Sequence, residues 1–246
     1  MIRDRRGVSE TVGFVLVFSL VVLTVGAVLT VGYGGLQDVR DAERVNNAQR
    51  AFDVLANNVE DITARGAPSR GTEIRLADAS ISRGTPTTLN VSGYESGARQ
   101  FATQYDSLGA VVYEAEGTQI RYAAGAVTRI GSGGSVGLVE PNFVISDRRV
   151  ILPIVQLSVG EESIAGSRTV LVRSERDLRD VEVDRAGVDR LELNVTSPAA
   201  GAWEGYLGGQ MDCERLPDDD GRRLSCETND LDRVQVISFS ISVTFE

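Results

Sequence analysis

The sequence predicts an α+β chain. A long N-terminal transmembrane and amphipathic helix should precede an antiparallel β-rich, sandwich-like head that carries one short covering helix. Two observations lead to this prediction: residues 11–37 are uncharged throughout, and from residue 72 onward short β-type segments alternate with Gly, Ser and Asp. The expected parts are a leader at 1–7, a transmembrane helix at 8–37, an amphipathic extension at 38–65 and a head at 66–246.

The uncharged run is long enough to cross a membrane, because a bilayer core about 30 Å thick needs roughly 20 helical residues. A secretory signal has a shorter apolar core and an A-x-A-like cut, and this run has no such site. Arg3, Arg5 and Arg6 precede it with a single aspartate among them. Arginine excess on the short leading side places the N-terminus in the cytoplasm and the head outside the cell. We therefore expect a retained single pass in contact with membrane lipid.

Beyond the run, apolar residues recur every three or four positions, which is the spacing of one helical face. The members of this stripe are Leu36, Val39, Ala42, Val45, Ala48, Phe52, Leu55, Val59 and Ile62. No proline occurs before Pro68, and Gly66 is a natural stop. A single helix from Val8 to Ala64 would be about 85 Å long at 1.5 Å per residue. Its first half suits lipid, and its second half suits packing under a globular head.

The head contains short β-type segments bounded by turn residues, a pattern typical of an antiparallel sandwich or open barrel. The segments are 73–81, 87–91, 110–116, 119–123, 150–159, 169–172, 191–195 and 234–245. The last one alternates apolar and polar residues but slips once at 236–238, which indicates a bulge or a misread register.

One helix interrupts this series. Ser197 and Pro198 suit an N-cap and a first helical position. The aromatic and aliphatic residues that follow should form a face that covers a sheet, and they are expected in the core: Trp203, Tyr206, Leu207 and Met211.

Composition excludes several kinds of chemistry. The net charge is −10 and the chain lacks both lysine and histidine, so it has no basic stripe for nucleic acid, no P-loop and no Schiff-base lysine. Residues 133–137 match the G-x-S-x-G pattern around Ser135, but a Ser-His-Asp triad cannot form without histidine. The acidic residues 218–220 could hold Ca²⁺, although the EF-hand pattern fails and an exposed acidic turn explains them equally well. We expect no catalytic residues, no cofactor, no metal and no nucleic-acid partner.

Two pairs of residues are expected to be modified if the head is outside the cell. Cys213 and Cys226 belong to no CxxC pair, and in an oxidising compartment a disulfide between them is expected, with two free buried thiols as the alternative. Asn90 and Asn194 each begin an N-x-[ST] sequon, and either could carry a glycan if the head is exported and the side chain faces outward.

The N-terminal residues carry a family resemblance. Arg5-Arg6-Gly7, followed by Val8-Ser9-Glu10-Thr11-Val12-Gly13 and the apolar run, resembles the class III signal of type IV pilins and archaellins. In that family a prepilin peptidase cuts after a basic and a small residue, which here implies a cut between Gly7 and Val8. Archaeal pilins commonly read Val-Ser-Pro-Val-Ile-Gly at this place, so Glu10 and Thr11 depart from the pattern. An acidic, lysine-free chain also resembles proteins of salt-adapted archaea. Through segments such as 44–55 and 66–74, the whole chain resembles uncharacterised membrane-anchored proteins of halophilic archaea.

The resemblance gives the apolar helix an assembly role. Gly26, Thr30 and Gly34 recur every four residues and would let sister helices approach closely, although glycine is also simply frequent in membrane helices. Buried in a bundle, Glu10 would need a cationic partner such as the Val8 amine of a neighbouring subunit. At the headgroup level it would instead be a solvated carboxylate.

The leading hypothesis is a pilin-like surface protein, not an enzyme, that is anchored or assembled in a filament through its helix. The main rival is a monomeric, membrane-tethered extracellular module that binds carbohydrate or a surface layer. A tethered hydrolase is disfavoured by the missing histidine and lysine.

Overall fold

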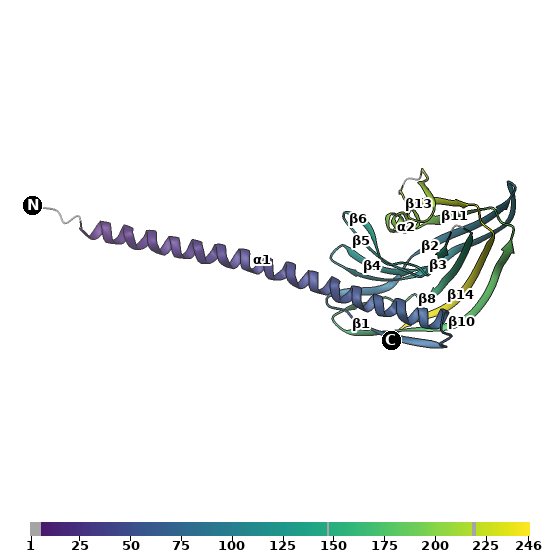
Figure 1. Ribbon diagram of the computed structural model, residues 1–246. Coiled ribbons are helices and arrows are strands. Elements are labelled where there is room, and N and C mark those ends of the chain that lie inside the picture. The colour runs from purple at the N-terminus through teal and green to yellow at the C-terminus, as the bar shows by residue number, and fades with distance from the viewer. Residues whose placement is uncertain (1–5, 147, 218–219) are drawn as a thin grey trace, which may run out of the picture. The chain divides into compact units, whose positions relative to one another are not determined.

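The computed structural model describes residues 6–146, 148–217 and 220–246, and the side chains at 6–11 and 31–38 lie outside this description. It divides into two compact units, Met1–Arg44 and Val45–Glu246, with the boundary inside the first helix. Figure 1 shows the elements, which in chain order are α1 Arg6–Thr63, β1 Ser69–Arg75, β2 Ala79–Glu95, β3 Ala98–Ala115, β4 Thr118–Ala123, β5 Ala126–Gly131, β6 Gly134–Val139, β7 Val144–Ile145, β8 Arg149–Val159, β9 Ile164–Gly166, β10 Thr169–Ala186, β11 Arg190–Thr196, α2 Ala200–Leu207, β12 Asp212–Arg215, β13 Arg223–Asn229 and β14 Arg233–Phe245.

The coarse prediction of an apolar N-terminal helix followed by a β-rich body with a short helix is confirmed. Within the described residues, one sheet has five strands in the order β1-β10-β14-β8-β7. The other has nine, in the order β12-β13-β11-β2-β3-β4-β5-β6, with β9 paired to β2. Both sheets are visibly curled in Figure 1.

The prediction of a purely antiparallel head is wrong at one place. β8 and β14 pair in parallel, with Val150 opposite Val234 and Val159 opposite Val243. Parallel neighbours need a long crossover between them. The chain supplies it, because residues 160–232 form β9 to β13 before the chain returns as β14.

The break in the apolar–polar alternation at residues 236–238 is not caused by a bulge in β14. Val234 and Val236 belong to the core cluster under α2, whereas Ile241 and Val243 belong to the cluster that contains α1. Even- and odd-numbered residues of a strand face opposite sides of the sheet. β14 therefore buries one face in its first half and the other face in its second half. The extra residues lie on its partner β10, where the pairing shifts between Arg176 and Leu178 and between Val181 and Val183.

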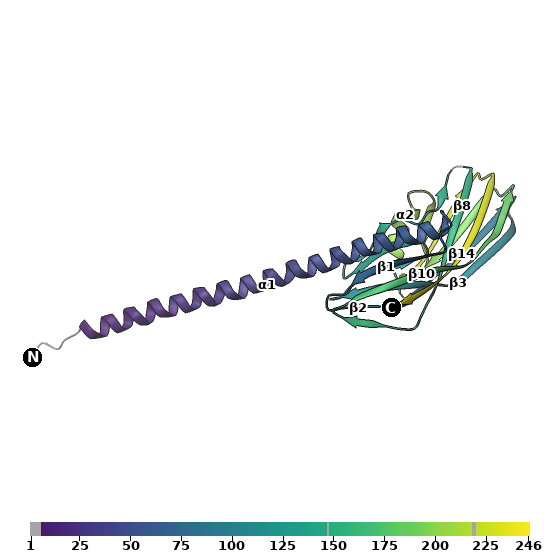
Figure 2. The same ribbon diagram turned by 90° about the horizontal axis from the view of Figure 1, so that it is seen from below.

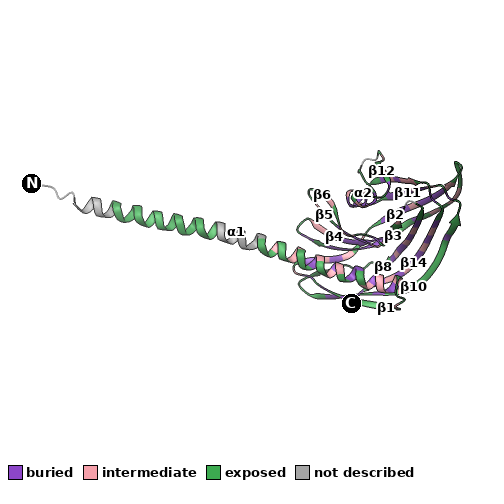
Figure 3. Ribbon diagram, in the orientation of Figure 1, coloured by how far each residue is buried: buried purple, intermediate pink, exposed green. Residues whose placement is uncertain are grey.

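The C-terminal part of α1 is a component of the head core. Figure 3 shows burial beginning on this part of the helix. Phe52 and Ile62 are completely buried, and they share a core cluster with residues of both sheets, such as Tyr113 and Val172. The predicted stripe is confirmed from Val45 to Ile62. Its earlier members Val39 and Ala42 are exposed, and the side chain of Leu36 lies outside the described part.

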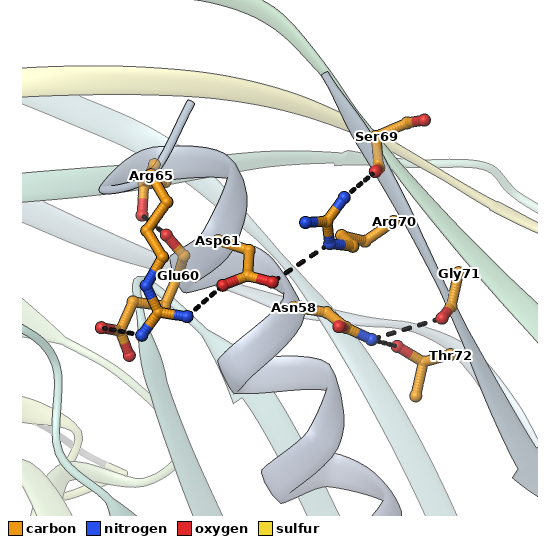
Figure 4. A network of polar contacts seen from close by, with 9 residues as sticks. Asn58, Glu60, Asp61, Arg65, Ser69, Arg70, Gly71 and Thr72 are labelled. Atoms are coloured by element: carbon orange, nitrogen blue, oxygen red, sulfur yellow. Dashed lines mark hydrogen bonds and ion pairs between the residues drawn. The ribbon is translucent and has the colours of Figure 1, made fainter. Parts of the chain in front are cut away.

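A polar network joins the same part of α1 to the edge strand β1, and Figures 1 and 2 both show these two elements side by side. Asn58 donates from Nδ2 to the hydroxyl of Thr72 at 2.9 Å and to the carbonyl of Gly71 at 3.3 Å. Asp61 accepts hydrogen bonds from Arg65 and, at 3.1 Å, from Arg70 (Figure 4). The contacts fix the helix end against the sheet and satisfy an outward carbonyl of an edge strand.

The predicted cap of α2 is wrong. The helix begins at Ala200, and its N-cap is Ala199, whose side chain makes no capping bond. Ser197 lies two residues earlier and is completely buried: its hydroxyl accepts the N–H of Ala199 at 3.2 Å, in the turn before the helix, and lies 3.2 Å from the hydroxyl of Thr87. The predicted core role of the helix is confirmed, because Trp203, Leu207 and Met211 are buried in the second core cluster.

Candidate functional site

The apolar half of α1 is the most conspicuous functional feature of the chain. Val12–Thr30 is long and apolar enough to cross a membrane by length and composition, and it is not buried inside the protein. Nineteen residues of helix span about 28 Å, close to the thickness of a bilayer core. Side chains such as Phe14, Leu23 and Val28 are each about 70% exposed. So large an apolar surface is not stable in water and requires lipid or other helices around it.

The polar side chains within this segment are satisfied by the helix itself. The hydroxyl of Thr24 donates to the carbonyl of Val21 at 2.9 Å, and that of Thr30 donates to the carbonyl of Gly26 at 2.8 Å. Neither hydroxyl therefore brings an unsatisfied donor into lipid. A methyl group added at Gly26 would meet no atom within 4 Å, so the helix surface is flat and open there.

The remaining predicted residues of the helix are only partly described. The backbone places Gly7 and Val8 in the first turn of α1. Their side-chain environment, and that of Glu10 and Gly34, lies outside the described residues. The predicted cut and the small-residue face therefore stay predictions.

The disulfide is present. Cys213 on β12 and Cys226 on β13 are direct cross-strand partners with Cα atoms 4.1 Å apart and a bond between their sulfurs. Cys226 is completely buried in the second core cluster. A closed loop of this length contributes roughly 3 kcal/mol in the chain-entropy account. The bond holds the edge strand β12 on a sheet that already covers a core.

The two sequon asparagines come together. Asn90 on β2 and Asn194 on β11 are direct partners across the strand pair. Their chain neighbours Leu89, Val91, Leu193 and Val195 are buried, so both asparagines face the outer side of the sheet. The Nδ2 atom of Asn194 donates to Glu192 at 2.7 Å, whereas Oδ1 of Asn90 is buried without a hydrogen-bond partner.

A polar groove of about 430 Å³ lies over this pair, and its walls include Thr88, Gln104, Glu192, Thr196 and Ser225. Gln104 is the partner of Asn90 on β3, and Ser225 is the partner of Asn194 on β13. Glu214 on β12 is the partner of Ser225, so five strands contribute one row of polar side chains to the groove. Sequence reasoning found the two asparagines through their sequons but missed their neighbours, because only the register brings residues from five segments together.

Ser135 has a structural role. Its hydroxyl accepts a hydrogen bond at 3.0 Å from the backbone N–H of Ala202, in the first turn of α2. The β5–β6 hairpin therefore gives the N–H of Ala202 a side-chain acceptor besides the carbonyl of Ala199, which lies 3.0 Å away. Among the described residues, no group of three or more Asp, Glu, His or Cys side chains could hold a metal ion; Asp218 and Asp219 lie outside that part of the chain.

Arg121 is a buried cation that sequence reasoning missed, because its alternating segment gives no sign of which face is covered. Its side chain is 2% exposed and donates to the carbonyl of Thr85 and to the hydroxyl of Thr87. Burial lowers the pKa of the guanidinium to about 10. Its hydrogen bonds go to β2 of its own sheet, so its contacts indicate a structural role.

A cavity of about 280 Å³ lies between the end of α1 and the two sheets. Val59, Val155 and Phe239 form apolar walls. At its rim, Glu60 pairs with Arg65 at 3.8 Å. Its volume is at the lower limit for small-molecule sites, and we assign no ligand to it.

A family model described as a family of unknown function, DUF7289, matches residues 6–244. The match covers the apolar helix and the head together, and the chain belongs to this family. No curated protein and no solved structure matches the chain.

Proposed function

We propose that this member of the DUF7289 family is a pilin-like surface protein. Its N-terminal helix is trimmed by a prepilin peptidase and then anchors the protein in the membrane or assembles with sister helices. The head is displayed outside the cell and performs no catalysis. The observation that carries the proposal is the exposed apolar segment Val12–Thr30, which follows Arg6 and Gly7 after four residues, 8–11.

The continuity of α1 supports a load-carrying role. One helix runs from Arg6 to Thr63, and its last third is part of the head core through Phe52, Leu55 and Val59. A helix that is merely a tether needs no such embedding. Force applied to the apolar half would pass directly into the core cluster of the head.

The small residues of the apolar half provide the assembly face in this proposal. In lipid, helices associate through close packing and not through the hydrophobic effect. The open surface at Gly26 and the internally bonded Thr30 suit such an approach. Gly34 would extend the face by one turn, and Glu10 would meet the Val8 amine of a neighbouring subunit.

The test is the N-terminal residue of the native protein. Mass spectrometry of the membrane fraction should find a mature chain that begins at Val8. Gly7→Leu should block the cut and leave residues 1–7 attached. Gly26→Leu, which lies beyond the signal motif where an added methyl group meets no atom within 4 Å, is the matched control and should be processed normally. A wild-type chain that keeps Met1 or begins at Ile2 would reject processing.

The second candidate is a monomeric, tethered module that binds carbohydrate or a surface layer. The polar groove over Asn90 and Asn194 favours it, since amides, hydroxyls and carboxylates are the groups that hydrogen-bond sugar hydroxyls. Purified surface filaments discriminate the two candidates. A pilin-like subunit copurifies with filaments, whereas a monomeric module stays in the detergent extract.

A further inference from the structure

We infer that the two sequons form a single glycan site, in which Asn194 carries the glycan and Asn90 lies unmodified beneath it. The inference rests on the proposed export of the head. It deepens that proposal by assigning one modified residue and one covered face.

The register places the two acceptor amides side by side. Asn90 and Asn194 are direct partners on adjacent antiparallel strands, where Cα atoms are about 5 Å apart. Both side chains point away from the core, because the residues before and after each of them are buried. A pyranose ring with its hydroxyls is broader than the spacing between neighbouring strands. Two rings rooted on these two amides would occupy the same space, so the paired strands accommodate one glycan.

The surroundings select Asn194. The two asparagines flank each other, and on its other side Asn90 has the long side chain of Gln104, while its Oδ1 is buried. Asn194 has the short side chain of Ser225 on its other flank.

The hydroxyl residues of the two sequons differ in exposure, and this difference also favours Asn194. Thr196, two residues after Asn194, is exposed, whereas Ser92, two residues after Asn90, is only 6% exposed. The sequon at Asn194 therefore lies open on the folded surface, and the sequon at Asn90 does not.

The chemistry is transfer of an oligosaccharide from a lipid-phosphate-linked donor. A bond forms between Nδ2 of Asn194 and the anomeric carbon of the sugar. The bond from that carbon to the phosphate oxygen breaks, the lipid phosphate leaves with the electron pair, and Nδ2 loses one proton. The second Nδ2 hydrogen remains available for the hydrogen bond to Glu192, which measures 2.7 Å in the unmodified protein.

The attached sugar would lie in the polar groove. Its hydroxyls could reach the side chains of Gln104, Thr88 and Ser225, which line the same groove. The groove is thus assigned to the chain's own glycan and not to an external saccharide.

The experiment is glycopeptide mass spectrometry of the full-length protein isolated from the membranes of the cells that make it. The wild type should carry one glycan per chain, on the peptide that contains Asn194. Asn90→Gln should be modified to the same extent as the wild type. Asn194→Gln should carry no glycan, a complete loss without transfer to Asn90.

Thr196→Val is the second variant, since it removes the sequon at an exposed position and leaves the asparagine and its contacts in place. It should also lose the glycan completely. A chain with glycans on both asparagines, a glycan on Asn90, or a sugar-free wild type each overturns the inference. Cleavage of the head by protease added to intact cells separates this failure from that of the proposed function. A head that is accessible but sugar-free defeats only the glycan site, whereas an inaccessible head also defeats the proposed export.

Discussion

Arg121 donates a hydrogen bond to the hydroxyl of Thr87 at 3.1 Å, and both side chains are buried in the head. The same hydroxyl lies 3.2 Å from that of Ser197, which precedes α2. The contacts link β4, β2 and the loop before α2. Among the described residues no carboxylate pairs with Arg121, so the cation is held by neutral oxygens alone.

Replacing Arg121 with Ala should strongly destabilise the head. The change leaves the carbonyl of Thr85 and the hydroxyl of Thr87 without this donor and opens a cavity, at a combined cost of about 3 kcal/mol in the free energy of unfolding. Urea unfolding followed by the fluorescence of Trp203, the single tryptophan, measures it. Arg129→Ala, on the neighbouring strand and exposed, is the control and should change stability by less than about 0.5 kcal/mol. Equal effects of the two variants would contradict the structural role of Arg121.

Phe52→Ala, a change in α1, should strongly reduce the free energy of unfolding of the head. Phe52 is completely buried, and removing its ring should cost about 3–5 kcal/mol. Val54→Ala, two residues on and 51% exposed, should cost less than about 0.5 kcal/mol. Thermal unfolding in detergent compares the two. A small effect of Phe52→Ala would show that the head folds without α1.

Ser135→Ala should remove the cap of α2. Loss of a capping hydroxyl costs about 1 kcal/mol, because the N–H of Ala202 loses an acceptor. Ser132→Ala, in the same hairpin but exposed, is the matched control. Trp203 lies one residue after the capped N–H, so its fluorescence reports the loss. A variant as stable as the control would refute the cap.

Asp61 should stabilise the head above about pH 4 and should lose this contribution as the pH falls further. Its hydrogen bond from Arg70, with a further one from Arg65, holds the pKa of the carboxyl below its usual value of 3.8. A carboxyl with a lowered pKa in the folded state adds stability that is complete above the unfolded value, near pH 4, and is lost as pH falls through the folded value. Asp61→Asn should therefore be less stable at pH 6 and should lose less stability on acidification.

Urea unfolding between pH 2.5 and 6 measures this dependence. Asp53→Asn removes one carboxylate from the same helix and is the control. Parallel pH curves for the wild type and Asp61→Asn would exclude the linkage.

The sequence predicts correctly those features that depend on residues close together in the chain. The three- and four-residue spacing around Phe52 predicted a helix that enters the core, and it does. The pair Cys213 and Cys226 was predicted to form a disulfide from spacing and compartment, and it does. The aromatic face of α2 was predicted correctly from Trp203 and its neighbours.

The failures concern contacts between distant segments. Ser197 accepts the N–H of Ala199 in the turn before α2, but the helix itself begins only at Ala200, where the hydroxyl of Ser135, 67 residues away from Ala202, contacts the first turn. The slip near Ile237 records a change of buried face, which depends on what packs against each end of the sheet. The pairing of Asn90 with Asn194 needs the register of β2 and β11, which neither segment contains alone.

The embedding of α1 limits how the head can be shed or produced alone. A protease that cuts after residue 65 would leave behind Leu55, Val59 and Ile62, and the two sheets would lose a shared wall of their interior. A stable secreted or recombinant fragment therefore has to begin near Val45, with the rear third of the helix attached. Loss of the apolar half alone would free an intact domain, whereas loss of the whole helix would free an unfolded one.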